Sequence, residues 1–508
     1  EIGYEHLLVA HEDALRFRKS FINPATNLEF EINNFSSHDL VIYKEGLSKI
    51  TGFTIRENWE ASLPKYSLVF QDQVSEATPD YWASGVESLF QPVKMVMDTS
   101  ASLRDLDGDF IIITIPAYVE GLEAYIAFKQ NEGWNPVSVS IADIYDEFNY
   151  GINSPFAIKS FLRYANNYWP SHPEYVLLIG DAISNPQQAK RDFRLKNIPT
   201  FYMQTYGWGA AEADFWYSLI NGDDYIPDLN IGRIPCSTRE DLETTLLKLI
   251  RYGSQENYGA WQNELITIAG FDTTFKIQSE ALLETSIPES FLPSRIFIDR
   301  DSEGQIFWGD TDSLVAHWNA GKILINFLGH GGGAVWADRS LFVRDDIHYL
   351  DSETPPAFVT SMTCFTGSFA QTRGLGEVVL TESPAGAIGW FGSSGVGWII
   401  NDYLMIQPLL RRLLEEHRPV GEIINSARME YFLANSGYDY LKPSMLFQYN
   451  YLGDPTTRLA LPVKHDILQT VKPIYLPDEQ IELSYSGVED GLLKILPINA
   501  EGHPWWTE

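Results

Sequence analysis

The fold is decided by residues 322–369, which read KILINFLGHGGGAVWADRSLFVRDDIHYLDSETPPAFVTSMTCFTGSF. Two apolar runs in this stretch, residues 323–328 and 357–362, each end abruptly at a short polar step. Buried parallel strands end in this way at the edge of a sheet. The first run leads to His330 and the second to Cys364. If the two strands are neighbours, an imidazole and a thiol leave the carboxyl ends of one sheet, where open α/β sheets place their sites.

This pair predicts a cysteine nucleophile served by a histidine base. Three glycines follow His330, so the backbone can turn tightly there and leave N–H groups open beside the imidazole. Such donors suit an oxyanion, and we assign the N–H groups of Gly331 and Cys364 to that role. Taken alone, Cys364 fits a small core residue and His330 a strand end. Their occurrence together, at the ends of two strands, favours the interpretation that they form a catalytic pair.

The sequence around the pair resembles the gingipain-type cysteine peptidases, peptidase family C25 of the caspase-like clan. Family members carry a tryptophan after the histidine and Gly-x-Phe after the nucleophile, which Trp336 and residues 367–369 match. Further matching pieces are YVLLIGD (175–181), NGDDYIPDLNIGRIP (221–235), GAIGWFGSS (386–394) and YLGDP (451–455). The resemblance covers residues 108–462. Gly332 and Thr363 depart from the family pattern, which bears on substrate preference more than on the chemistry.

The resemblance implies acyl transfer through a thioacyl-enzyme. Cys364 attacks the scissile carbonyl, and a nearby imidazolium lowers the pKa of its thiol toward neutrality. His330 protonates the leaving amine and later activates water. Asp272 stands where related enzymes have an acid that orients the histidine. It fits an N-cap of the following helix equally well.

Substrate preference rests on Asp402. An ungapped alignment of GSSGVGWIINDY, residues 392–403, puts Asp402 on the acid that lysine-specific members carry, which would select a basic P1 residue. The interpretation ranked first is that Asp402 caps a helix beginning near Tyr403. Trp398 is expected to line the same pocket, and Trp336 is a further substrate-binding candidate.

The chemistry requires no cofactor, but a structural calcium ion is predicted. Asp299, Asp301 and Glu303, with Asp310 at the twelfth place, follow the ligand spacing of a calcium loop. Most such oxygen-rich turns bind only water, and the resemblance is what favours calcium here.

Length and composition limit the possible architectures and partners. A chain of 508 residues is expected to hold two to four domains. Its net charge of −32 argues against nucleic acid and anionic membranes as partners. There are only two cysteines, and if one of them is a nucleophile the other has no partner, so a disulfide scaffold is excluded. No apolar run is long enough for a transmembrane helix.

We predict a caspase-like, doubly wound α/β fold with a mainly parallel sheet in two subdomains, flanked by β-sandwich modules. The expected domains are a β-rich domain (1–104), a first α/β subdomain (105–255), the catalytic subdomain (256–462) and the start of an immunoglobulin-like module (463–508). The chain begins without methionine or a signal-like segment. We therefore expect a piece processed or excised from a longer protein, and the resemblance implies a secreted or cell-surface bacterial one.

Three functions compete. The first is an endopeptidase acting on protein or peptide substrates. The second is a sortase-like transpeptidase of the type IX secretion system, with secretion-machinery partners. The third is a non-catalytic binding module, which the presence of both His330 and Cys364 disfavours.

Overall fold

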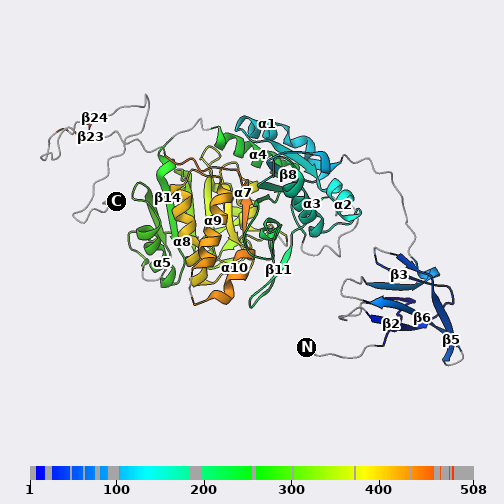
Figure 1. The fold of residues 1–508 in the computed structure, drawn as a ribbon. Coiled ribbons are helices and arrows are strands. Elements are labelled where there is room, and N and C mark those ends of the chain that lie inside the picture. Colours follow the sequence, from blue (N-terminus) through cyan, green and yellow to red (C-terminus); the bar gives the residue numbers. More distant parts are fainter. Residues whose placement is uncertain are drawn as a thin grey trace. The chain divides into compact units, whose positions relative to one another are not determined.

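The computed structural model describes residues 7–17, 26–45, 48–60, 63–74, 80–89, 102–183, 196–254, 259–299, 302–370, 373–434, 437–462, 469–470, 480 and 483–484. The chain divides into two compact units, residues 1–98 and 99–508 (Figure 1).

The N-terminal unit is a β-sandwich, as its alternating strands predict. One antiparallel sheet has the order β1 (Ala14–Phe17), β7 (Tyr81–Gly85), β3 (Leu40–Lys44) and β4 (Ser48–Ile50). The other has the order β2 (Thr26–Phe35), β6 (Leu63–Val74) and β5 (Phe53–Glu60). Both sheets contribute to one apolar core, in which the rings of Phe30 and Tyr81 pack 5.3 Å apart.

The second unit is built on one ten-stranded, mainly parallel sheet. Its order is β15 (Leu292–Phe297), β14 (Glu264–Ala269), β16 (Leu324–Leu328), β20 (Ala357–Met362), β21 (Ala387–Ser393), β22 (Tyr449–Gly453), β13 (Asn230–Ile234), β10 (Tyr175–Ile179), β8 (Phe110–Thr114) and β9 (Pro136–Ser140). The first five strands run parallel to one another, and so do the last four. Several strands are buried along their whole length, which explains their continuous apolar sequences.

The two α/β halves expected from the sequence share this sheet. β22 comes from the end of the domain and enters between the halves, antiparallel to β21 and paired with β13. The mainly parallel α/β fold is therefore confirmed, and its halves form one continuous sheet.

Helices cover both faces of the sheet, as a doubly wound fold requires. They are α1 (Glu123–Asn131), α2 (Ile141–Asn149), α3 (Pro155–Tyr168), α4 (Arg239–Gly253), α5 (Thr273–Thr285), α6 (Thr311–Asn319), α7 (Leu375–Thr381), α8 (Ile399–Glu415), α9 (Val420–Leu433) and α10 (Lys442–Gln448). Alternate residues of β14, β16 and β20 face two separate cores. Helices α5, α8 and α9 pack on the first core, where they lie along one face in Figure 1, and α6 and α7 pack on the second.

Smaller sheets lie outside the large one. β11 (Tyr202–Thr205) and β12 (Gly209–Glu212) form a hairpin, and β17 (Gly331–Gly332), β18 (Val335–Trp336) and β19 (Phe342–Val343) form a short sheet after β16. The predicted C-terminal module falls largely outside the described residues. Of its described part, β23 (Gln469–Thr470) pairs with β24 (Leu483–Ser484). Among the residues that the structure describes, no helix combines the length and apolar character needed to cross a membrane.

Candidate active site

His330 and Cys364 emerge from neighbouring strands at the same edge of the sheet. β16 and β20 pair in parallel, with Leu328 opposite Met362 in the register. Each of the two functional residues follows two positions later. The juxtaposition predicted from the two apolar runs is therefore present in the fold.

The glycine after the histidine packs directly against the cysteine turn. A Cβ atom on Gly331 would lie 2.7 Å from the carbonyl oxygen of Cys364 and 2.6 Å from Cγ2 of Thr363, closer than a side chain tolerates. The backbone of the histidine loop and that of the nucleophile loop lie so close together that only glycine fits at position 331. This contact places the Gly331 backbone beside the thiol-bearing residue, where its predicted oxyanion role would need it.

The thiol of Cys364 is half-buried and accepts a hydrogen bond. The backbone N–H of Gly397 donates to its Sγ atom at 3.2 Å. Burial raises the pKa of the Cys364 thiol, the carboxylate of Asp402 raises it further, and the Gly397 hydrogen bond acts in the opposite direction. The expected imidazolium is not among these causes, and no hydrogen bond joins His330 to Cys364 in the described part of the chain.

The imidazole of His330 is exposed and rests edge-on against an aromatic ring. Its ring centroid lies 5.2 Å from that of Phe275 in α5, with the planes 83° apart. Its backbone is fixed, because its N–H donates to Oδ2 of Asp338 at 2.7 Å and its carbonyl accepts from Ala337 at 2.8 Å. The loop is anchored while the ring remains open to solvent.

Asp338 is a buried residue that sequence reasoning missed. Its carboxylate accepts the backbone N–H groups of His330 and Phe271, so it joins the ends of β16 and β14. Burial raises its pKa, whereas these two hydrogen bonds lower it. Cβ atoms on Gly270 and Gly329 would lie only 2.1 and 2.7 Å from its Oδ2 atom. Glycine at both strand ends was the available signal that another group packs closely there.

Asp272 caps the helix that follows β14. Its side chain accepts the backbone N–H of Thr274 at 2.8 Å at the start of α5. This hydrogen bond and the charge of His330 lower the pKa of Asp272. The predicted helix cap is therefore confirmed, and the orienting role toward the histidine stays a prediction.

Asp402 lies behind the nucleophile turn and does not cap its helix. α8 begins at Ile399 rather than near Tyr403, so Asp402 falls within the first turn and the predicted cap is wrong. The side chain is buried, its Oδ1 atom accepts from the hydroxyl of Tyr449 at 2.7 Å, and burial raises its pKa to about 6. A Cβ on Gly397 would lie 2.6 Å from Asp402 Oδ2 and 3.3 Å from the Cys364 nitrogen. The glycine therefore fills the narrow space between the carboxylate and the nucleophile.

The two tryptophans predicted to bind substrate differ in position. Trp398 is half-buried at the start of α8, and its ring lies 5.8 Å from that of Tyr206. Trp336 is fully buried, stacked on Phe327 at 4.6 Å and hydrogen-bonded to Ser361 at 2.9 Å. It has no surface to offer a substrate, so its predicted role is corrected to packing beneath the histidine loop.

The acids of the predicted calcium loop have other partners. Asp310 caps α6, and the hydrogen bonds from Ser313 lower its pKa. Glu303 pairs with Arg339 at 3.0 Å, Asp299 accepts from the N–H of Ser302 at 3.1 Å, and Asp301 lies outside the described residues. Within the described ranges, no three His, Cys, Asp or Glu side chains converge to hold a metal ion. Because Asp301 lies outside the described residues, the structure does not test the loop of four acids, and calcium stays a sequence prediction.

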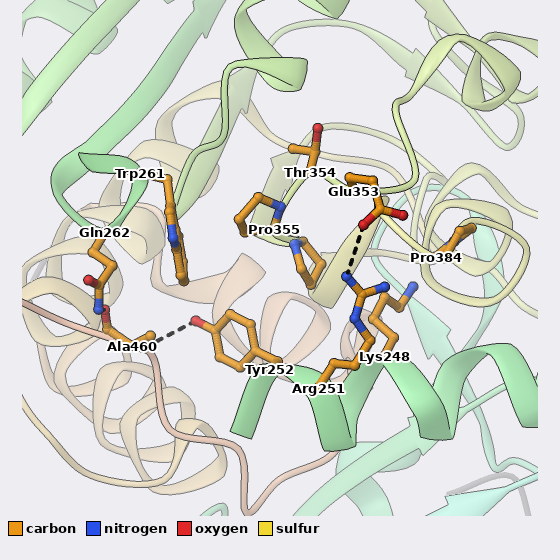
Figure 2. Close-up of a pocket in the computed structure, with 11 residues that line it drawn as sticks. Lys248, Arg251, Tyr252, Trp261, Gln262, Glu353, Thr354, Pro355, Pro384 and Ala460 are labelled. Carbon is orange, nitrogen blue, oxygen red and sulfur yellow. Dashed lines mark hydrogen bonds and ion pairs between the residues drawn. The ribbon is translucent and has the colours of Figure 1, made fainter. Parts of the chain in front are cut away.

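A pocket opens at the other edge of the sheet (Figure 2). Trp261 precedes β14 and Pro355 precedes β20, so this pocket adjoins the amino ends of strands whose carboxyl ends lead to the candidate site. Figure 2 shows Arg251 turned toward Glu353 across it, at 3.9 Å. Lys248 lines the pocket too, and burial lowers its pKa to about 7. This pocket is separate from the Cys364 edge.

The fold is that of a mainly parallel α/β protein, with a histidine and a cysteine at one edge of its large sheet. The model of peptidase family C25 matches residues 104–460, which is more than half of the chain. The chain belongs to this family.

Named relatives agree with this assignment. Gingipain R2 of Porphyromonas gingivalis is 24% identical over 301 residues, 56% of this chain and 36% of that protein. Lys-gingipain W83 of the same organism is 20% identical over 332 residues, 64% of this chain and 17% of that protein. The matched region therefore spans only a minor part of these relatives. The crystal structure of the Arg specific cysteine proteinase gingipain R shares the fold, with a TM-score of 0.57 at 18% identity over 72% of this chain and 80% of that one.

Proposed function

We propose that the chain is a gingipain-type cysteine endopeptidase in which Cys364 is the nucleophile and His330 the general acid and base. The observation that carries this proposal is the parallel pairing of β16 and β20, which brings both residues to one edge of the sheet. Membership of a cysteine peptidase family adds independent support.

The proposed reaction begins when the thiol of Cys364 gives its proton to His330. The sulfur attacks the scissile carbonyl, the carbon–nitrogen bond breaks, and His330 returns the proton to the leaving amine. Water, deprotonated by His330, then hydrolyses the thioacyl-enzyme. The N–H groups of Gly331 and Cys364 are assigned to the oxyanion. Because His330 is exposed and not hydrogen-bonded to the thiol, we infer that bound substrate brings the pair together.

We further propose a preference for a basic P1 residue, supplied by Asp402. Its carboxylate is buried beside Gly397, whose N–H binds the Cys364 thiol, and its charge acts on that thiol, so a cation bound beside Cys364 would be attracted to it. The expected result is that Asp402→Asn lowers kcat/KM after Lys and Arg by at least roughly tenfold, whereas Leu and Asn substrates show no loss. Fluorogenic peptides that differ only at P1 measure this, and an equal loss for every P1 residue would sink the idea.

A sortase-like transpeptidase is the second candidate. It shares the thioacyl intermediate, and the presence of an N-terminal β-sandwich in addition to the peptidase fold is the observation that favours it. Added amine nucleophiles separate the two: a peptidase releases free carboxylate at an unchanged rate, whereas a transpeptidase gives mainly the amide product by mass spectrometry. Secretion-machinery partners and a secreted or cell-surface location belong to this proposal and stay predictions.

A further inference from the structure

The tip of the β11–β12 hairpin carries exposed aromatic side chains beside the nucleophile. Tyr206 and Trp208, separated by Gly207, are 51% and 66% exposed. Large apolar side chains are normally buried, so two adjacent exposed rings need a reason.

The hairpin is held firmly against the loop that follows Cys364. Glu212, at the end of β12, accepts hydrogen bonds from Oγ of Ser368 at 2.9 Å and from the backbone N–H of Ala370 at 3.3 Å. At the tip, the N–H of Tyr206 donates to Oγ of Ser444 in α10 at 2.8 Å. A segment from the first half of the domain is thereby fixed to the nucleophile loop of the second half.

The exposed rings continue into a cluster around the nucleophile. Trp208 lies 5.8 Å, ring to ring, from Phe365, the residue directly after Cys364. Tyr206 lies 5.8 Å from Trp398 and 5.0 Å from Tyr440. Phe365 adopts a left-handed backbone with φ of 60°, a strained conformation that persists mostly at functional sites. The cluster therefore forms an aromatic surface beside the Cys364 turn.

The chemistry of the cluster favours an uncharged occupant. Asp439, the chain neighbour of Tyr440, pairs with Lys442 at 2.6 Å, and Asp402 is the acid assigned to the P1 side chain. The rings present apolar faces and edges, which gain most from another apolar or aromatic side chain.

We propose that Tyr206, Trp208 and Phe365 form an aromatic clamp that binds an apolar or aromatic side chain of the peptide substrate adjacent to the scissile bond. This inference rests on the proposed peptidase function and adds a second specificity element to it. Trp208 is a specificity residue that positions substrate and takes no part in bond breaking.

The test uses four quenched fluorogenic peptides with Lys at P1 and either Phe or Ala at P2 and at P1′. The expected result is that Trp208→Ala raises KM for the Phe peptides roughly fivefold. KM for the peptide with Ala at both P2 and P1′, called the all-Ala peptide, should stay unchanged. Trp208→Phe should restore the preference. Tyr349→Ala is the matched control, because Tyr349 is also 66% exposed but ends η9 (Arg344–Tyr349) away from the hairpin, and it should change nothing.

Binding to the Cys364→Ala protein tests the clamp without turnover. The Phe peptides should bind this protein more tightly than the all-Ala peptide, and adding Trp208→Ala should remove the difference. Equal loss for the Phe and Ala peptides would overturn the clamp. If the wild-type protein cleaves nothing, the peptidase proposal fails, and these dissociation constants still decide the clamp.

Discussion

The two cysteines of this chain occupy similar places in the sheet and have opposite surroundings. Cys236 lies two positions after the last residue of β13, as Cys364 lies two positions after the last residue of β20. Yet Cys236 is only 1% exposed, and burial raises its pKa, with Asp241 and Asp181 adding to the rise. Cys364 is half-buried beside a glycine-rich histidine loop and accepts an N–H group.

The difference lies in the segment after each strand. After Cys236 the chain soon enters α4 through a capping box of Thr238 and Asp241, and the Cys236 side chain is buried. After Cys364 comes an irregular loop that leaves the sulfur accessible. The strand end thus fixes the position of each thiol, and the segment that follows determines whether the thiol is buried in the core or accessible for reaction.

Replacing each cysteine in turn should separate the two positions most clearly. Cys364→Ala is expected to lower kcat/KM by at least about 1,000-fold with little change in Tm, because the nucleophile is lost from a half-exposed site. Cys236→Ala should retain activity and cost about 1 kcal/mol of unfolding free energy, because it leaves a small cavity. Peptide hydrolysis and thermal unfolding measure both, and an active Cys364→Ala protein would refute the assignment.

Removing Asp338 should give the next largest effect. Asp338→Ala leaves the N–H groups of His330 and Phe271 without their acceptor, so kcat should fall roughly 10- to 100-fold with KM nearly unchanged. Asp338→Asn keeps one acceptor oxygen and should recover part of the loss. Asp346→Ala is the control, because Asp346 also accepts a loop N–H, that of Val343 at 2.8 Å. If both alanine variants lose kcat equally, Asp338 has no special role in holding His330.

The charge of Asp402 should control thiol reactivity in a pH-dependent way. Because this carboxylate raises the pKa of Cys364, Asp402→Asn should lower that pKa and speed alkylation by iodoacetamide a few-fold at pH 7 to 8. Burial raises the pKa of Asp402 to about 6, so the wild-type charge is present above pH 6 and lost below it. The difference between the proteins should therefore vanish near pH 5. Labelling rates by intact mass from pH 5 to 9 test this, and identical rates throughout would contradict it.

Asp272 should give the smallest effect. Asp272→Ala removes the N-cap of α5 and is expected to cost about 1 kcal/mol of stability, seen as a lower Tm. Asp272→Ser keeps a capping oxygen without the charge. If the serine variant restores Tm but kcat stays about tenfold low, the carboxylate acts on His330; full recovery of kcat leaves the cap as its only role.

The features that depend on local pattern could be predicted from the sequence alone. Continuous apolar runs indicated the buried parallel strands, and the polar steps after them placed His330 and Cys364 at one sheet edge. The Ser154-Pro155 pair marks the start of α3, because Ser154 caps it and proline suits its first turn. The β-rich domain predicted over residues 1–104 likewise has two antiparallel sheets.

Contacts made between loops could not be predicted from the sequence pattern. The spacing of Trp336 after the histidine does not reveal that the ring turns inward onto Phe327. The acidic spacing of a calcium loop also serves helix caps and ion pairs, as Asp310 and Glu303 show. The hairpin tip contacts residues distant in sequence, so only the folded chain reveals its place, and the glycines at the ends of β14 and β16 indicate close packing there without identifying Asp338.

The most direct test of Cys364 as the nucleophile is covalent labelling by peptidyl acyloxymethyl ketones with Lys, Arg, Asn, Asp or Leu at P1. We expect one adduct per chain, mapped to Cys364 with Cys236 unmodified, formed fastest with Lys or Arg and strongly slowed by His330→Ala. An adduct on Cys236 instead, or no adduct with any probe on protein that unfolds cooperatively, would contradict this assignment.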